Sequence, residues 1–457
     1  MVNGFEFSKI KTKKLPESWK QEGVLEELER FLQANWEQRS IFYSDGYVTS
    51  RQQFIDFDKC DGIKLQNYIG TIIYKGEQLN IFPKIFKEDE DDFDTDGLEL
   101  EDLINNLVYW LTYCDKLNFP FVSMKNELSA TENLMELFIT IYVHYLKNAI
   151  DKQRFFRYEE ITETGSYVKG KINFYDYATR KFPNGRMNEL EYTYSNFVFD
   201  NQLNQIIKCT CIFLLNLTQQ SGNKAIIRNV LMKLGDVYQR NCMPYECDEV
   251  HLSFLNSNYR IILSMSKMFL LNKVNSNSVG NAETFCFLFP AEVLFEGFIG
   301  GFIKETFKEK ARVRTQTSDL YLAELFVDGK LIGNAFHLRE DILVESGDDI
   351  FILDTKYKEI ERFNKVKETK KLNVSDSDMK QMAIYAAKRG PKKLYLIYPL
   401  HRNEEPETME IRFDIHIGEE GNHIIIPLEI LKVPFAFGDD EKFTKKLLKD
   451  MLEKVIS

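Results

Sequence analysis

Two short apolar runs joined by a polar turn constrain this chain more than any other feature. The runs are 342–344 (ILV) and 350–353 (IFIL), and they flank the turn-forming residues 346–349 (SGDD). Short apolar runs on either side of such a turn predict a β-hairpin. A symmetric hairpin places Asp341 directly opposite Asp354, with Cβ atoms about 5 Å apart.

Two carboxylates in that position repel each other unless something compensates. A hard divalent cation does so, because it prefers carboxylate oxygens as ligands. Side chains alternate along a strand, so Lys356 is predicted on the same face as Asp354. Two acids, a cation and an ammonium suit phosphodiester hydrolysis: the metal activates a water, and the lysine orients it or stabilises phosphate charge.

The segments before and after the hairpin extend this pattern. Residues 291–307 predict an amphipathic helix containing Glu296, which either faces the metal or is a solvated charge. With a later helix and a strand at 392–398, the order is helix, about three strands, helix, strand. Six basic residues precede the second helix and either contact DNA phosphates or are simply solvated. They are Lys358, Arg362, Lys365, Lys367, Lys370 and Lys371.

The second helix has clear start and stop signals. Ser375 is a suitable N-cap, with the acid Asp378 three residues later. Gln381 and Tyr385 are four residues apart and therefore share a helix face. Gly-Pro at 390–391 ends the helix.

The rest of the chain predicts an α/β (α+β multidomain) protein. Residues 1–97 are predicted to form a mixed α/β N-terminal region, in which 68–86 forms a hairpin with its turn at Lys75-Gly76. Residues 98–280 are largely helical with short strands. The polar segment 272–284 is interpreted as a linker. The range 281–457 holds the proposed acidic site.

Composition excludes several classes of protein. The net charge of −11 does not fit a chain that coats nucleic acid with its whole surface. Seven cysteines, an odd number, argue against a disulfide framework. No apolar run is long enough to span a membrane and the first residues lack a secretory core, so we expect a cytoplasmic protein. The P-loop-like residues 165–171 lack the final Ser or Thr, so a partner is expected to hold any nucleotide.

Taken together, these residues resemble a known family. Asp341 with Asp354-Thr355-Lys356 resembles the PD-(D/E)xK nuclease motif, and Gln381 with Tyr385 resembles the QxxxY helix of its RecB-like branch. The wider sequence is similar to McrC proteins, the nuclease subunits of McrBC-type restriction systems. The segments that carry this resemblance are 68–85, 165–174, 199–215, 287–299, 352–358 and 378–386.

The resemblance implies a C-terminal restriction-endonuclease-like αβββαβ domain that cuts double-stranded DNA, often with modified cytosines, using Mg²⁺. It implies a McrB-like hexameric AAA+ GTPase as partner, which binds the GTP and is stimulated by the N-terminal half of McrC. By position, Asp341 and Asp354, with Thr355, are the implied metal ligands and Lys356 the catalytic lysine. Supporting catalytic-site residues are then Glu296, Gln381 and Tyr385.

The sequence departs from the family motif at one position, and two alternative functions are kept. Glu340 stands where the motif name places Pro, at a position that varies in the superfamily. The residues that reach the partner's GTPase site are not identified, and 68–83 or 155–190 are the candidate segments. The chain is alternatively a regulatory activator of a AAA+ NTPase with a decayed nuclease, or a stand-alone repair nuclease. The intact pair of acids with Lys356 argues against decay.

Overall fold

A computed structural model describes residues 2–37, 55–58, 62–87, 100–114, 134–253, 256–278, 285–360, 371–402, 404, 410–419, 422–436 and 441–456. The chain divides into two compact units, Met1–Leu134 with Ala282–Ser457, and Met135–Asn281. The predicted ranges 1–97 and 281–457 therefore fall almost entirely within one unit, and 98–280 is shared between both. As independent domains, the three ranges stay predictions.

The first unit contains a four-stranded sheet built around the predicted N-terminal hairpin. Lys75 and Gly76 form its turn with positive φ angles of 53° and 78°, the conformation that a two-residue hairpin loop requires. Strand β10 pairs antiparallel with β5, so a strand from the C-terminal range completes this sheet. The strand order is β1 (Val2–Phe5), β6 (Glu77–Phe82), β5 (Tyr68–Tyr74) and β10 (Phe285–Pro290).

Smaller elements accompany that sheet. A three-stranded sheet has the order β2 (Lys9–Lys11), β4 (Gly62–Leu65), β3 (Ile55–Asp58). The helices are α1 (Val24–Glu37) and α2 (Leu100–Leu111), with short 3-10 turns at Thr12–Lys14, Glu17–Trp19 and Lys84–Phe86.

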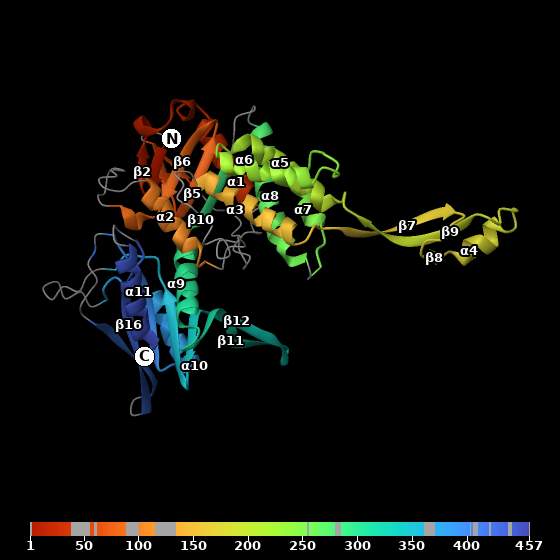
Figure 1. The fold of residues 1–457 in the computed structure, drawn as a ribbon. Coiled ribbons are helices and arrows are strands. Elements are labelled where there is room, and N and C mark those ends of the chain that lie inside the picture. The colour runs from red at the N-terminus through yellow and green to blue at the C-terminus, as the bar shows by residue number, and fades with distance from the viewer. Residues whose placement is uncertain are drawn as a thin grey trace. The chain divides into compact units, whose positions relative to one another are not determined.

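A six-stranded sheet holds the predicted hairpin (Figure 1). Its order is β11 (Arg312–Val327), β12 (Lys330–Ser346), β13 (Asp349–Thr355), β14 (Lys393–Leu400), β16 (Asn422–Pro434) and β15 (Ile411–Glu419). The helices of this part are α9 (Ala291–Phe307), α10 (Asp376–Arg389) and α11 (Glu441–Ile456). The expected order of helix, three strands, helix and strand is present as α9, β11 to β13, α10 and β14.

The predicted hairpin register is confirmed. Ile342 pairs with Leu353, and the pairing continues to the turn. Strand β12 is much longer than the predicted 342–344, because its first half pairs with β11 in a separate ribbon. The sequence signal covered only the part of β12 that is buried.

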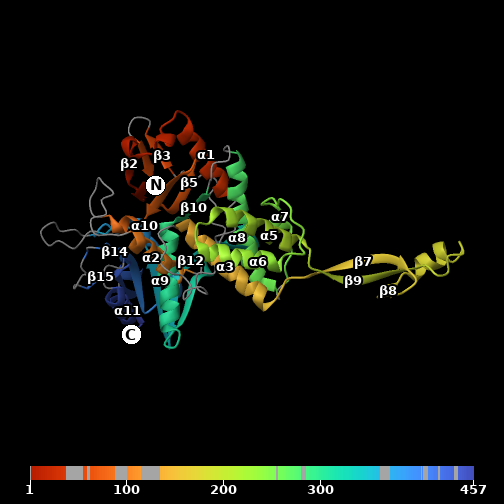
Figure 2. The ribbon, with the colours of Figure 1, turned by 45° about the horizontal axis from the view of Figure 1, so that its top comes forward.

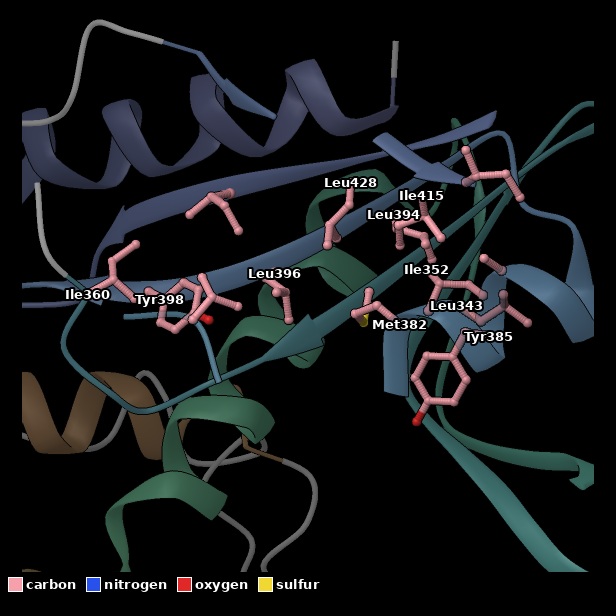
Figure 3. Close-up of a cluster of buried hydrophobic side chains, with 14 residues drawn as sticks. Leu343, Ile352, Ile360, Met382, Tyr385, Leu394, Leu396, Tyr398, Ile415 and Leu428 are labelled. Atoms are coloured by element: carbon pink, nitrogen blue, oxygen red, sulfur yellow. The ribbon is translucent and has the colours of Figure 1, made fainter. Parts of the chain in front are cut away.

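Close packing and a shared apolar core hold this sheet between its helices. A Cβ atom on Gly301 would lie 1.9 Å from the Tyr113 carbonyl oxygen, so only glycine lets α9 approach the end of α2 so closely. On the α10 side, Met382 and Tyr385 pack with Leu343, Ile352 and other strand residues in one buried cluster (Figure 3). The hydroxyl of Tyr385 points away from that cluster.

The second unit is a helical body with a long β-arm (Figures 1 and 2). The predicted linker 272–284 is wrong in part, because its first residues continue α8; residues 279–284 lie outside the described residues. The helices are α3 (Leu134–Lys152), α5 (Gln202–Leu217), α6 (Ser221–Lys233), α7 (Glu246–Glu249) and α8 (Ser257–Ser278). The arm consists of β7 (Arg157–Gly165), β8 (Lys171–Ile172), α4 (Phe174–Asp176), a π-helical turn (Tyr177–Lys181) and β9 (Leu190–Val198).

Within the described ranges, no helix combines the length and apolarity needed to cross a bilayer. All six cysteines in those ranges are free and buried.

Candidate active site

The two predicted acids meet where β12 and β13 separate. Ile342 and Leu353 are the last paired residues, and Asp341 and Asp354 are the next on each strand. The backbone N–H and the Oγ1 hydroxyl of Thr355 both donate to Asp341 Oδ2, each at 2.9 Å. Thr355 therefore fixes the orientation of the first acid through both its backbone N–H and its side chain.

Asp354 is fully buried. Burial, followed by the neighbouring charge of Asp341, raises the pKa of Asp354 to about 7, against the opposing charge of Lys356. This is the repulsion that the hairpin pattern predicted, and it means that the pair lacks a full set of compensating charges.

Lys356 supplies one compensating charge. Its Nζ lies 2.5 Å from Asp354 Oδ2, as the alternation of side chains predicted. Burial lowers the pKa of Lys356, but the charge of Asp354 and the hydrogen bond to it outweigh burial and raise the pKa overall. Its backbone N–H donates to the carbonyl of Ile397 in β14 at 2.8 Å, which fixes the lysine beside the parallel strand.

Helix α10 places the side chains of Gln381 and Tyr385 next to these groups, and a hydrogen bond joins the two side chains. Gln381 Nε2 donates to Asp354 Oδ1 at 3.2 Å and to the Tyr385 hydroxyl at 2.8 Å, while Lys356 Nζ donates to Gln381 Oε1 at 3.2 Å. The side chain of Ser375 caps the helix by accepting from the Asp378 N–H, and Gly390 ends it at φ 61°. The predicted helix with its Ser375 cap and Gly390 end is confirmed, and Gln381 contacts Asp354.

Asp378 is a member of this network that the sequence analysis used only as a helix-start signal. It is buried, its carboxylate lies 3.1 Å from Lys358 Nζ, and it lies 3.9 Å from Lys356 Nζ. The signal that identifies it is helical spacing, because Asp378 is three residues before Gln381 and shares its face. Lys358, whose side chain is half exposed, therefore pairs with a buried acid next to the site, and its contact with DNA stays a prediction.

Glu296 is half-buried in α9. This helix packs on the sheet, since a Cβ atom on Gly300 would lie 3.7 Å from Ile342 Cγ1. The ring of Phe295, next to Glu296, lies 5.9 Å from the ring of Tyr357, which follows Lys356. Glu296 thus lies along α9 near the end of β13, and a direct role at the acids stays a prediction.

Of the six predicted DNA-contacting basic residues, two are described. Lys358 pairs with Asp378, and Lys371 lies 2.7 Å from Asp376 in the first turn of α10. Arg362, Lys365, Lys367 and Lys370 lie outside the described residues.

The donor set fits a hard divalent cation. Asp341 and Asp354 supply carboxylate oxygens, and their mutual repulsion favours a cation between them. Within the described parts of the chain, no three or more His, Cys, Asp or Glu side chains converge as a metal cluster. Mg²⁺ tolerates such a sparse set, because it usually keeps several waters and takes one or two carboxylates.

Comparisons with known proteins agree with this architecture. A family model described as the McrBC 5-methylcytosine restriction system component matches residues 63–399. No curated protein matches the sequence.

Two solved structures are similar to the chain. One is a chain of the refined half-complex from the tetradecameric assembly of Thermococcus gammatolerans McrB AAA+ hexamers with bound McrC. It has 16% identity and a TM-score of 0.63, covering 98% of this chain and 99% of that one. The other is the Thermococcus gammatolerans McrBC complex, with 17% identity and a TM-score of 0.49, covering 66% and 86%. At 16% identity the first likeness shows the fold alone.

Proposed function

Because the chain belongs to the McrBC 5-methylcytosine restriction system component family, we propose that it is the endonuclease subunit of a McrBC-type, type IV restriction complex. In this proposal it cuts double-stranded DNA with modified cytosines in the cytoplasm, with Mg²⁺. One observation carries the proposal: Asp341, Asp354 and Lys356 converge at one end of a hairpin, under Gln381. This arrangement supports a PD-(D/E)xK site.

Each side chain has a definite task in phosphodiester hydrolysis. Asp341 and Asp354 would hold Mg²⁺, with Thr355 orienting Asp341 and its main chain as a further candidate ligand. Mg²⁺, when bound, supplies an activated water and neutralises charge on the phosphate. Lys356 remains an ammonium and donates hydrogen bonds to the phosphate oxygens or to the attacking water.

Gln381 and Tyr385 position these groups and make no contact with the phosphate in this proposal. The amide of Gln381 links Asp354 to Lys356, so both keep one geometry relative to each other. Tyr385 holds the same amide through its hydroxyl. Glu296 is proposed as a supporting acid at the α9 side of the site.

The proposed partner is a McrB-like hexameric AAA+ GTPase, which would bind the GTP. The similar Thermococcus gammatolerans chain comes from an assembly of McrB AAA+ hexamers with bound McrC. The β-arm is the best candidate for contacting such a ring, because it contains most of the predicted segment 155–190 and exposes many aromatic side chains. They are Tyr158, Tyr167, Phe174, Tyr175, Phe182 and Phe197.

Cleavage of a plasmid bearing methylated cytosine tests the proposal. We expect cutting only when the purified chain, Mg²⁺, the AAA+ protein encoded beside it and GTP are all present. Cutting by the chain with Mg²⁺ alone would favour the stand-alone repair nuclease. Stimulated GTP hydrolysis without cutting in any mixture would favour the regulatory activator.

A further inference from the structure

Glu340, directly before Asp341, is a buried carboxylate with a matched partner. It is 1% exposed. Arg389, the last residue of α10, places Nε 2.9 Å from Glu340 Oε1 and Nη2 2.8 Å from Glu340 Oε2. This is a bidentate guanidinium–carboxylate pair, which fixes direction as well as distance. Arg389 also pairs with Asp319 of β11.

A second contact from the same helix holds the preceding residue. The hydroxyl of Tyr385 donates to the backbone carbonyl of Arg339. Helix α10 therefore holds the two residues that lead into Asp341, one through the main chain and one through the side chain.

The sheet itself restrains this stretch of β12 weakly. The pairing with β13 ends at Ile342, one residue after Asp341. On the other side, the register with β11 is interrupted between Thr317 and Leu320, next to the pair formed by Thr317 and Glu340. Asp341 thus lies directly beyond the last pair of the β13 ladder and next to the last regular pair of the β11 ladder before its irregularity. Thr355 orients the Asp341 carboxylate, while contacts from helix α10 hold the main chain that leads into it.

We propose that Arg389 is a positioning residue, which fixes the first metal-binding acid by clamping Glu340 to the end of α10. The inference rests on the proposed function, because it assigns Asp341 to the metal. Proline at that position fixes φ covalently; here a buried ion pair restrains the chain instead. Helix α10 then aligns both acids, Asp354 through Gln381 and Asp341 through Arg389.

Stability alone does not account for this pair. A buried ion pair is often no more stabilising than apolar side chains of similar volume, because both charges lose their hydration. Its specific value is geometric, since the planar guanidinium has one way to meet a carboxylate with two bonds. Because Glu340 directly precedes the proposed metal ligand Asp341, holding Glu340 in place also holds Asp341 in place.

The test is Arg389→Lys in the full-length chain, with Glu340→Gln as a second variant. Lysine keeps the charge opposite Glu340 and so avoids an uncompensated buried carboxylate, but it loses the bidentate fork. The probe is Mn²⁺, which carboxylate sites accept in place of Mg²⁺ and whose free-ion electron paramagnetic resonance signal disappears on binding. We expect both variants to bind Mn²⁺ about 10-fold more weakly, the lower end of the range for groups that orient metal ligands.

The matched control is Arg412→Lys, because Arg412 makes a similar two-bond pair with Asp414 on an exposed face of the same sheet. This control is expected to bind Mn²⁺ like the wild type. If Arg389→Lys melts earlier but binds Mn²⁺ normally at a temperature where it is folded, the pair is merely structural and the inference is overturned. A wild-type chain that binds no Mn²⁺ overturns the proposed function and the inference with it.

Discussion

Asp354 bears a carboxylate in a place from which water is excluded and where a second carboxylate is close. The burial and the neighbouring charge raise its pKa to about 7. Lys356 and Gln381 offset part of that cost. The remaining repulsion is what favours a cation, so the same residue weakens the fold and prepares the site.

This cost predicts the pH dependence of stability. The folded-state pKa of Asp354 lies above its unfolded value, so its contribution is fully present below the unfolded pKa and is lost as pH rises toward 7. Asp354→Asn removes this loss. We expect the stability of the variant relative to wild type to rise by about 2 kcal/mol from about pH 5 to about pH 8.

Urea unfolding of both proteins at the two pH values, without divalent cations, measures this difference. Glu6, whose pKa burial also raises to about 7, titrates with the same sign in both proteins and cancels. A pH-independent difference between the two proteins would show that Asp354 is not the group responsible.

Gln381 provides a second prediction at this scale. Gln381→Leu removes the links to both Asp354 and Lys356 but keeps the helix and its apolar face. We expect cleavage by the complete complex to fall about 10- to 100-fold, as for other groups that orient a metal site. Asp376→Asn, exposed on the same helix, is the control and should cut normally. Equal cleavage rates for Gln381→Leu and wild type would show that the Gln381 amide does not position Asp354 and Lys356.

At the scale of elements, the bounds of a helix were predictable wherever apolar side chains recur at helical spacing or capping residues mark its ends. Helix α9 spans the predicted 291–307, and Ser375 with Gly390 bound α10 as predicted. The long extension of β12 was not predictable from the runs 342–344 and 350–353, because ribbon strands that expose both faces lack a buried period. Asp378 was visible in the sequence but was assigned to capping alone.

The β-arm carries the prediction for the partner. Tyr167 and Tyr175 near its tip are 83% and 80% exposed. Tyr167→Ala with Tyr175→Ala should leave folding unchanged, because surface substitutions away from packed features alter stability by roughly 0.5 kcal/mol or less. We expect stimulation of the partner's GTPase to fall severalfold while Mn²⁺ binding stays normal. Unchanged stimulation would direct attention to the hairpin at 68–83.

At the scale of the whole molecule, contacts distant in sequence were beyond prediction. Strand β10 completes a sheet with β5 although nearly half of the chain separates them. Trp110, from the expected middle range, donates through Nε1 to the carbonyl of Phe435 at 2.9 Å, and the two rings stack at 3.9 Å. A single sequence gives no signal for such pairings, because periodicity reports only the local environment.

This cross-range packing predicts that 281–457 is not independent of the preceding sequence. Trp110 is fully buried, and Trp110→Ala should lower the unfolding free energy by about 3–5 kcal/mol. The six-stranded sheet should be affected as strongly as the N-terminal sheets. Hydrogen exchange of β14 and β16 measures this, with the exposed Tyr245→Ala as control. Normal protection of both strands in the Trp110 variant would support 281–457 as an independent domain.

The most direct test of the central claim is cleavage and GTP hydrolysis measured together for Asp354→Ala in the complete complex with Mg²⁺. Asp349→Ala is the control, because Asp349 is an acid of the same strand that pairs with the exposed Lys392. We predict that Asp354→Ala abolishes cutting and leaves partner GTPase stimulation intact, while Asp349→Ala retains both. Cutting by the Asp354 variant at the wild-type rate would contradict the assignment of this site as the nuclease centre.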